Sequence, residues 1–145
     1  MIQRIQTIFY LLAALAFGGL FKFAFASSSE SIPQYLADQT YNVHDHIAIL
    51  ILVILGLISA LAAIFLFKNR SLQLKTGYAV VAMSVLIPAV AFLVLYLEKS
   101  VLETEVEVSP GIGLYLPIGA LLFGILGNRF VKKDDKLVKS MDRLR

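Results

Sequence analysis

Four long apolar stretches constrain this chain most strongly, because each has about the length of a helix that crosses a bilayer, roughly 20 residues. They cover residues 5–25, 47–67, 77–97 and 111–130. The two middle stretches contain no charged residue, so neither has the polar face that a surface helix of a soluble protein needs. Apolar residues make up 59% of the chain, more than a soluble domain of 145 residues would bury. The sequence therefore predicts an all-α integral membrane protein, with a four-transmembrane-helix bundle over residues 1–131.

The charged residues are distributed unequally between the two sides of the predicted membrane. Eleven of the thirteen basic residues lie toward the two ends of the chain or between the second and third stretches, and only Lys22 and Lys99 lie elsewhere. Seven of the ten acidic residues follow the opposite distribution. Because the cytoplasmic loops of membrane proteins carry the excess of Lys and Arg, we expect a multi-pass protein of the bacterial inner membrane with both termini cytoplasmic.

The first stretch has a second interpretation. Its end, Ala24-Phe25-Ala26 before a serine cluster, resembles the cleavage site of a secretory signal peptide. The apolar run is longer than the ~7–15 residues of a signal-peptide core, and Lys22 lies where that core would still be apolar. We therefore favour a retained transmembrane helix.

Small residues in the stretches indicate where the helices would pack, because close helix contact in lipid needs small side chains. Such residues could line the inside of a bundle or form a face for another membrane protein, and internal packing is the simpler expectation. Pro88 and Pro117 should kink or loosen their helices. The residues that we expect at helix contacts are Gly56, Ser59, Ala60, Ala63, Gly119 and Gly124.

The two loops on the acidic side carry weaker signals. Residues 101–108 alternate apolar and acidic side chains over much of their length, which is typical of an extended segment. A short outer β-hairpin that joins the two loops is compatible with this pattern. His44 and His46 flank Asp45 just before the second stretch and could bind a metal ion with nearby acids. The alternative, which we favour, is that these residues cap a helix at the interface.

Signatures of catalysis and ion transport are absent from the sequence. The chain has no cysteine, so it offers no thiolate nucleophile and no zinc-thiolate or iron–sulfur site. It contains no hydrolase elbow, metalloprotease or phosphate-loop motif. The central part of every apolar stretch is free of charged residues, which disfavours an ion pump. We expect a non-enzymatic protein without a metal or cofactor, although an apolar lipid or quinone site would leave little trace in a sequence.

The basic tail, residues 132–145, has the most specific pattern. Leu137, Val138, Met141 and Leu144 would form one apolar stripe on a helix, with basic residues on both sides. This tail could lie on anionic lipid or dock on a protein partner, and the three Asp residues among its basic residues favour the protein contact. We expect membrane lipids as partners and no nucleic acid. The docking residues predicted here are Lys132, Lys133, Lys136, Leu137, Lys139, Met141, Arg143, Leu144 and Arg145.

Both ends of the chain resemble a known family. The opening MIQRIQTIFYLLA and the closing segments GLYLPI and KDDKLVKSMDRLR are similar to a Bacteroidota inner-membrane family catalogued as domain of unknown function 4293. The family pattern has arginine in place of Lys139 and alanine in place of Met141 or Gly127, and these differences conserve charge or size. The resemblance implies four helices in an inner membrane and no particular activity.

These observations favour an accessory or assembly subunit of a larger inner-membrane complex, for example in protein export or envelope biogenesis. The alternative is a small transporter or a lipid- or quinone-binding membrane protein, built around Pro88 and Pro117.

Overall fold

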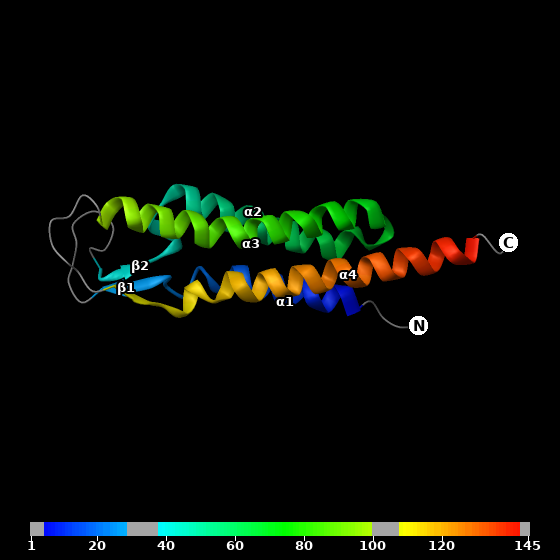
Figure 1. The fold of residues 1–145 in the computed structure, drawn as a ribbon, viewed down its shortest axis with the longest axis horizontal. Helices are drawn as coiled ribbons and strands as arrows, with labels where there is room; N and C mark the ends of the chain where they lie inside the picture. Colours follow the sequence, from blue (N-terminus) through cyan, green and yellow to red (C-terminus); the bar gives the residue numbers. More distant parts are fainter. Residues whose placement is uncertain (1–4, 29–37, 100–107, 143–145) are drawn as a thin grey trace.

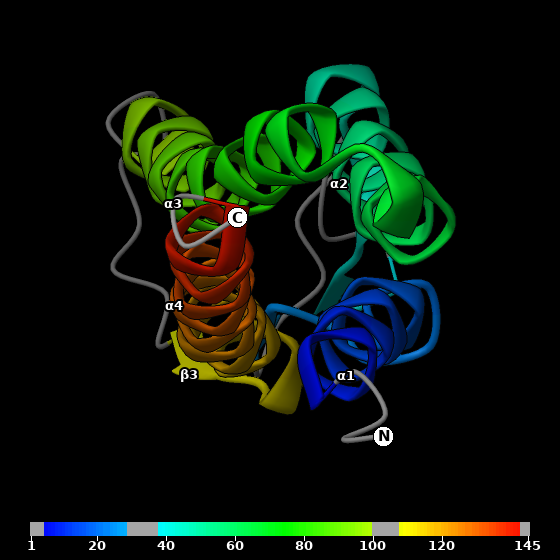
Figure 2. The ribbon, with the colours of Figure 1, turned by 90° about the vertical axis from the view of Figure 1, so that its right-hand side faces the viewer.

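The computed structural model describes residues 5–28, 38–99 and 108–142. It contains four helices: α1 (Ile5–Gly19), α2 (Ile47–Phe65), α3 (Arg70–Lys99) and α4 (Leu116–Asp142). The helices lie side by side along one axis (Figure 1). Viewed along that axis, α1 and α3 are diagonal to each other (Figure 2), and each of them packs against both α2 and α4. The predicted four helices are thus confirmed.

Three helices, α2, α3 and α4, are long and apolar enough to cross a membrane. Helix α1 is shorter than predicted, because it ends at Gly19 and not near residue 25. Gly18 and Gly19 are poor helix formers. The amides of Lys22 and Phe23 both donate hydrogen bonds to the carbonyl of Gly19, each at 3.0 Å, which closes the helix with a turn. The chain after α1 is therefore free to enter a sheet.

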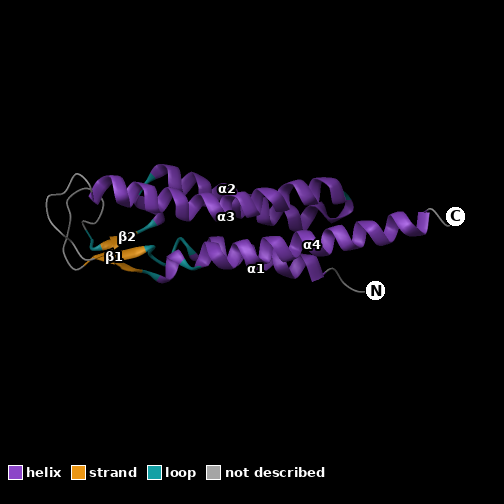
Figure 3. Cartoon of the chain, in the orientation of Figure 1, coloured by secondary structure: helices purple, strands orange, loops and turns teal. Residues whose placement is uncertain are grey.

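That sheet closes one end of the molecule (Figure 3). Strand β1 (Ala26–Ser28) lies in its centre and pairs antiparallel with β2 (Thr40–Tyr41) and with β3 (Val108–Pro110). The two loops therefore do pair, but in three short strands and not in a single hairpin. Residues 101–107, where the alternating pattern lies, are outside the described residues.

Two glycines let the chain before α4 pack tightly against the chain before β1. Gly111 donates its amide to the Phe25 carbonyl, and Gly113 donates to the Ala24 carbonyl, both at 2.8 Å. A Cβ atom at position 113 would lie 2.5 Å from that same Ala24 oxygen, which is backbone and cannot swing away. Glycine is therefore required at this position.

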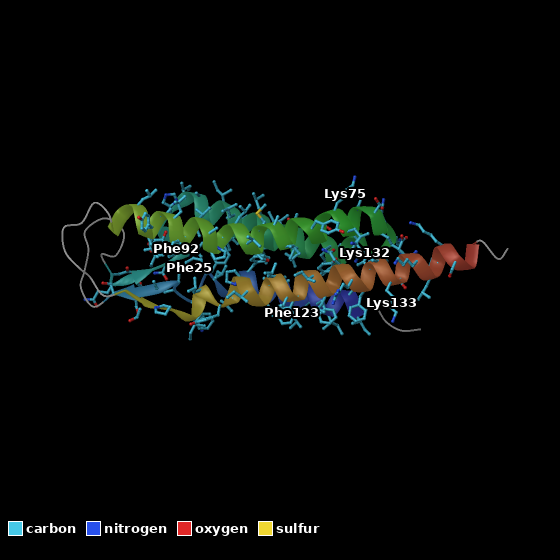
Figure 4. All side chains as sticks on the ribbon, viewed as in Figure 1. Phe25, Lys75, Phe92, Phe123, Lys132 and Lys133 are labelled. Atoms are coloured by element: carbon cyan, nitrogen blue, oxygen red, sulfur yellow. The ribbon has the colours of Figure 1, made fainter. Side chains whose placement is uncertain are left out.

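The interior is filled mainly by large apolar side chains. Phe17, Leu20, Phe25, Val53 and Ile87 are almost completely buried. Many other apolar side chains on the outer faces of the helices are exposed, as lipid-facing side chains of a membrane protein would be (Figure 4).

The two prolines occupy different positions in their helices. Pro117 is buried in the first turn of α4, where a helix needs no amide donor, so it starts the helix and does not kink it. Pro88 lies inside α3, which continues to Lys99.

Candidate functional site

A group of buried polar side chains joins the helices at the end opposite the sheet. We call Gln6, Tyr10, Gln73 and Asn128 the polar cluster; each is at most 5% exposed. The Tyr10 hydroxyl of α1 donates to Oδ1 of Asn128 of α4 at 2.9 Å. The Gln6 amide donates to Oε1 of Gln73 at 3.4 Å, which links α1 to the diagonal helix α3. Gln73 in turn donates to the Ala63 carbonyl of α2 at 2.8 Å. Two hydrogen-bonded groups, Tyr10–Asn128 and Gln6–Gln73–Ala63, therefore connect α1 with the other three helices.

Two glycines make room for the Tyr10–Asn128 pair. A Cβ atom on Gly77 would overlap Oδ1 of Asn128 and would lie 2.5 Å from the Tyr10 hydroxyl. A Cβ atom on Gly127 would lie 2.9–3.2 Å from three atoms of the Tyr10 ring. Close approach of α3 and α4 to the tyrosine thus depends on having no side chain at either position.

The chemistry of the polar cluster suits a contact that holds the helices together, which we call the clamp. Its members are two glutamines, an asparagine and a tyrosine, so they supply amide and hydroxyl groups and no carboxylate, imidazole or amine. Their donors and acceptors are directed at one another and at a backbone carbonyl. Hydrogen bonds of this kind between helices in lipid contribute about 0.6–2 kcal/mol each. The arrangement suits fixed packing of the four helices.

Sequence reasoning did not single out this cluster. The available signal was the presence of Gln6 and Asn128, two amide side chains within apolar stretches, since a polar group in lipid needs a partner. The identity of that partner was not readable, because Tyr10 and Asn128 are 118 positions apart.

The small residues predicted at helix contacts fall into two groups. Gly56 is buried beneath Phe17 of α1, where an added Cβ atom would come within 3.0–3.2 Å of the Phe17 ring. A Cβ atom added to Gly124 would lie 3.0 Å from the side chain of Val80 and 3.2 Å from that of Val81, both on α3. Ala60 and Ala63 are fully buried. Ser59 and Gly119 are half-buried, and a Cβ atom on Gly119 would meet one ring atom of Phe123, in its own helix, at 3.9 Å.

Helix α4 continues without interruption from the apolar stretch into the basic tail. It extends past the turn between α2 and α3 and past the start of α1 (Figure 1). We call residues 132–142 the projecting end. Figure 4 marks Lys132 and Lys133 on it, and Lys75 on α3. The ammonium group of Lys132 lies over the Tyr78 ring, 5.3 Å from its centroid.

Two ion pairs occupy the carboxylates at the start of the projecting end. Arg70 of α3 pairs with Asp134 at 3.2 Å, and Lys139 pairs with Asp135 at 2.6 Å. Within the described parts of the chain, Lys133 and Lys136 have no carboxylate within ion-pair distance, and both are exposed.

Two residues of the predicted apolar stripe of the tail, Leu137 and Val138, have described side chains. Val138 is half-buried, two turns after the fully buried Val131, whereas Leu137 is 55% exposed. The side chain of Met141 and residues 143–145, which include Arg143, Leu144 and Arg145, lie outside what the structure describes.

The histidine pair lies at the sheet end. His46 is the N-cap of α2, and its Nδ1 accepts a hydrogen bond from the Ala48 amide at 3.3 Å. Asp45 accepts from the Asn42 amide, and the exposed His44 ring lies 5.8 Å from the Phe21 ring. Among the described residues, no group of three or more His, Cys, Asp or Glu side chains is arranged to hold a metal ion.

One carboxylate at the sheet end has a shifted acidity. The pKa of Asp38 is lowered, because the hydroxyl and the backbone amide of Thr40 both donate hydrogen bonds to its carboxylate. This contact caps the turn that precedes β2.

Comparison with known proteins identifies the family. No curated protein and no solved structure matches the chain. A family model described as a domain of unknown function, DUF4293, matches residues 2–144. The chain therefore belongs to the DUF4293 family.

Proposed function

We propose that this protein is a small, non-enzymatic subunit of the bacterial inner membrane that assists or assembles a larger membrane complex. The projecting end of α4 is the docking element. The observation that carries this proposal is the continuation of α4, as one uninterrupted helix, beyond the other three helices. Crossing the membrane does not require residues 132–142 to continue the helix past the other three.

The surface of the projecting end suits an acidic protein partner. Lys133 and Lys136 are exposed and have no carboxylate partner in the described structure, while the carboxylates of Asp134 and Asp135 are already paired. Leu137, next to them, offers an exposed apolar side chain. A partner with an apolar groove and flanking carboxylates would match both features.

The orientation in the membrane is part of the proposal. The excess of basic residues toward the chain ends and in the α2–α3 turn supports a cytoplasmic position for both termini. The projecting end would then meet its partner at the cytoplasmic surface.

The alternative function, a small transporter or a lipid- or quinone-binding protein, has less support. It needs polar groups that converge between the helices and remain open to a ligand. The members of the polar cluster do converge, but they bond to one another and to Ala63. Toward the sheet, the interior is occupied by Phe17, Val53 and Ile87. These contacts favour fixed packing over ligand transit.

Affinity purification in mild detergent with quantitative mass spectrometry tests the proposal. The wild-type chain should retain partner subunits that are lost from the triple variant Lys133→Gln, Lys136→Gln, Leu137→Ser. The matched control is Lys75→Gln, which removes an exposed charge from α3 at the same end of the molecule. A photo-crosslinking residue at position 136 should form an adduct with the same partner. A wild-type protein that purifies alone, or a control that loses the partner equally, would contradict the proposal.

A further inference from the structure

The helices do not reach equally far toward the sheet end. The polar cluster provides a common level, because Gly77 of α3 and Asn128 of α4 meet there. From that level α3 continues 20 residues to Leu97, about 30 Å, which matches the hydrocarbon thickness of a bilayer. Helix α4 reaches back only 12 residues to Leu116, about 18 Å. Helix α1 stops at the same place, since a Cβ atom on Gly19 would lie 3.1 Å from the Leu116 side chain.

Beyond the ends of α1 and α4 on this side, the chain leaves the α-helical conformation, with a turn after α1 and a short 3-10 helix, Ile112–Leu114, before α4, yet its backbone is well bonded. The amide of Phe23 donates to the Gly19 carbonyl at 3.0 Å, and that of Phe25 donates to the Tyr41 carbonyl at 2.8 Å. Gly111 and Gly113 donate to the carbonyls of Phe25 and Ala24. Irregular backbone is tolerated at membrane depth only where its polar groups are satisfied in this way.

This part of the chain exposes apolar side chains on its surface, and between two of them it exposes Lys22, whose long side chain can extend toward the headgroups. Phe21 is 38% exposed and Phe23 39%, while Ile112 is 63% and Tyr115 59% exposed. We call these four residues the apolar collar. The exposed residues of the sheet itself are polar or small, for example Ser27 and Ser109. The collar is continuous with the exposed apolar face of the helices below it, which includes Leu15 of α1, 63% exposed.

We propose that the apolar collar lies inside the bilayer and contacts lipid acyl chains beneath the headgroups. Between the polar cluster and the sheet, α2 and α3 would then cross the membrane as helices. Beside them, α1 and α4 end nearer to the polar cluster in this direction, and the hydrogen-bonded chain beyond them, which includes the 3-10 helix Ile112–Leu114, would complete the crossing. The continuity of the collar with the lipid-facing side of α1, and the missing length of about 12 Å relative to α3, identify acyl chains as the occupant of this surface. This placement does not depend on the docking function proposed for α4.

The absence of tryptophan from the chain gives a direct test. The single-tryptophan variants Phe23→Trp and Ile112→Trp would be reconstituted in phosphatidylcholine vesicles, with and without bromine on the acyl chains. Leu15→Trp is the control for a lipid-facing helix position, and Ser109→Trp is the control for the sheet. Tyr115→Trp, a conservative change, provides a third collar position if either of the first two variants does not fold.

We expect the collar variants to lose fluorescence in brominated lipid to a degree comparable with Leu15→Trp and to be protected from aqueous iodide. Ser109→Trp should show the reverse. If the collar variants instead behave like Ser109→Trp, quenched by iodide and unaffected by bromine, the collar lies in water and the proposal is wrong. Since these positions are far from the projecting end, this result is separate from any result on partner binding.

Discussion

Replacing Gly77 by alanine tests whether the polar cluster is a fixed clamp. The added methyl group would overlap Oδ1 of Asn128 and would lie 2.5 Å from the Tyr10 hydroxyl, in a site where both side chains are buried. Forcing a methyl group into such packing costs about 1–3 kcal/mol. Displacing the Tyr10–Asn128 hydrogen bond costs about 1 kcal/mol more. The better helix propensity of alanine offsets about 1 kcal/mol of this loss of stability. The net loss of stability should therefore be about 1–3 kcal/mol.

The assay is reversible unfolding in mixed micelles by titration with sodium dodecyl sulfate, followed by far-ultraviolet circular dichroism. Gly18→Ala is the matched control, because a Cβ atom at that position of α1 meets no atom within 4 Å. It should leave stability unchanged or raise it by up to about 1 kcal/mol.

A double-variant cycle sharpens the Gly77 prediction. Asn128→Ala removes the oxygen that the new methyl group would overlap, so Gly77→Ala should be less harmful in that background. The two losses should fall short of additivity by about 1 kcal/mol. The clamp would be refuted if Gly77→Ala destabilised no more than Gly18→Ala, or if the two losses simply added.

Three further predictions follow from contacts elsewhere in the structure. Tyr10→Phe keeps the buried ring but removes the donor to Asn128, so it should cost about 1–2 kcal/mol in the same unfolding assay. Gly113→Ala would place its methyl group 2.5 Å from the Ala24 backbone oxygen. Because the backbone can move away only by distorting the sheet end, amide hydrogen exchange should accelerate more at the sheet end than at the polar cluster. Arg70→Ala breaks an ion pair whose side chains are 31% and 51% exposed, so stability should change by less than about 1 kcal/mol, and a larger loss would show that the pair is not merely a surface contact.

The sequence was sufficient to locate the four helices but not to place the end of the first. Five of the six residues from Leu20 to Phe25 are apolar, and Lys22 lies close enough to the end of the stretch to extend its side chain to the interface, so the apolar run alone favoured a helix as far as residue 25. The structure ends α1 at Gly19 because the following chain pairs with β2 and β3, which come from later in the sequence. Short strands whose partners are distant leave little local signal.

The polar cluster was hidden for a related reason. Gly77 and Gly127 read as ordinary small residues in apolar stretches, and their role became clear only when Tyr10 was seen between them. The basic character of the tail, in contrast, was readable directly. The sequence did not predict that the tail continues α4 without a break, since a charged segment after an apolar stretch is equally compatible with a separate surface helix.

The position of the polar cluster bears on how the projecting end works. Asn128 is one turn before Lys132, and α4 is held there by Tyr10, then by the contact of Lys132 with Tyr78, and then by Arg70 at Asp134. Three contacts within two helical turns restrict the rotation of α4 about its axis as it leaves the bundle. Rotation decides which side chains a helix offers, because neighbouring positions differ by about 100°. Together, these three contacts therefore fix the direction of the face that carries Lys133 and Lys136, which is the face that the proposed docking would use.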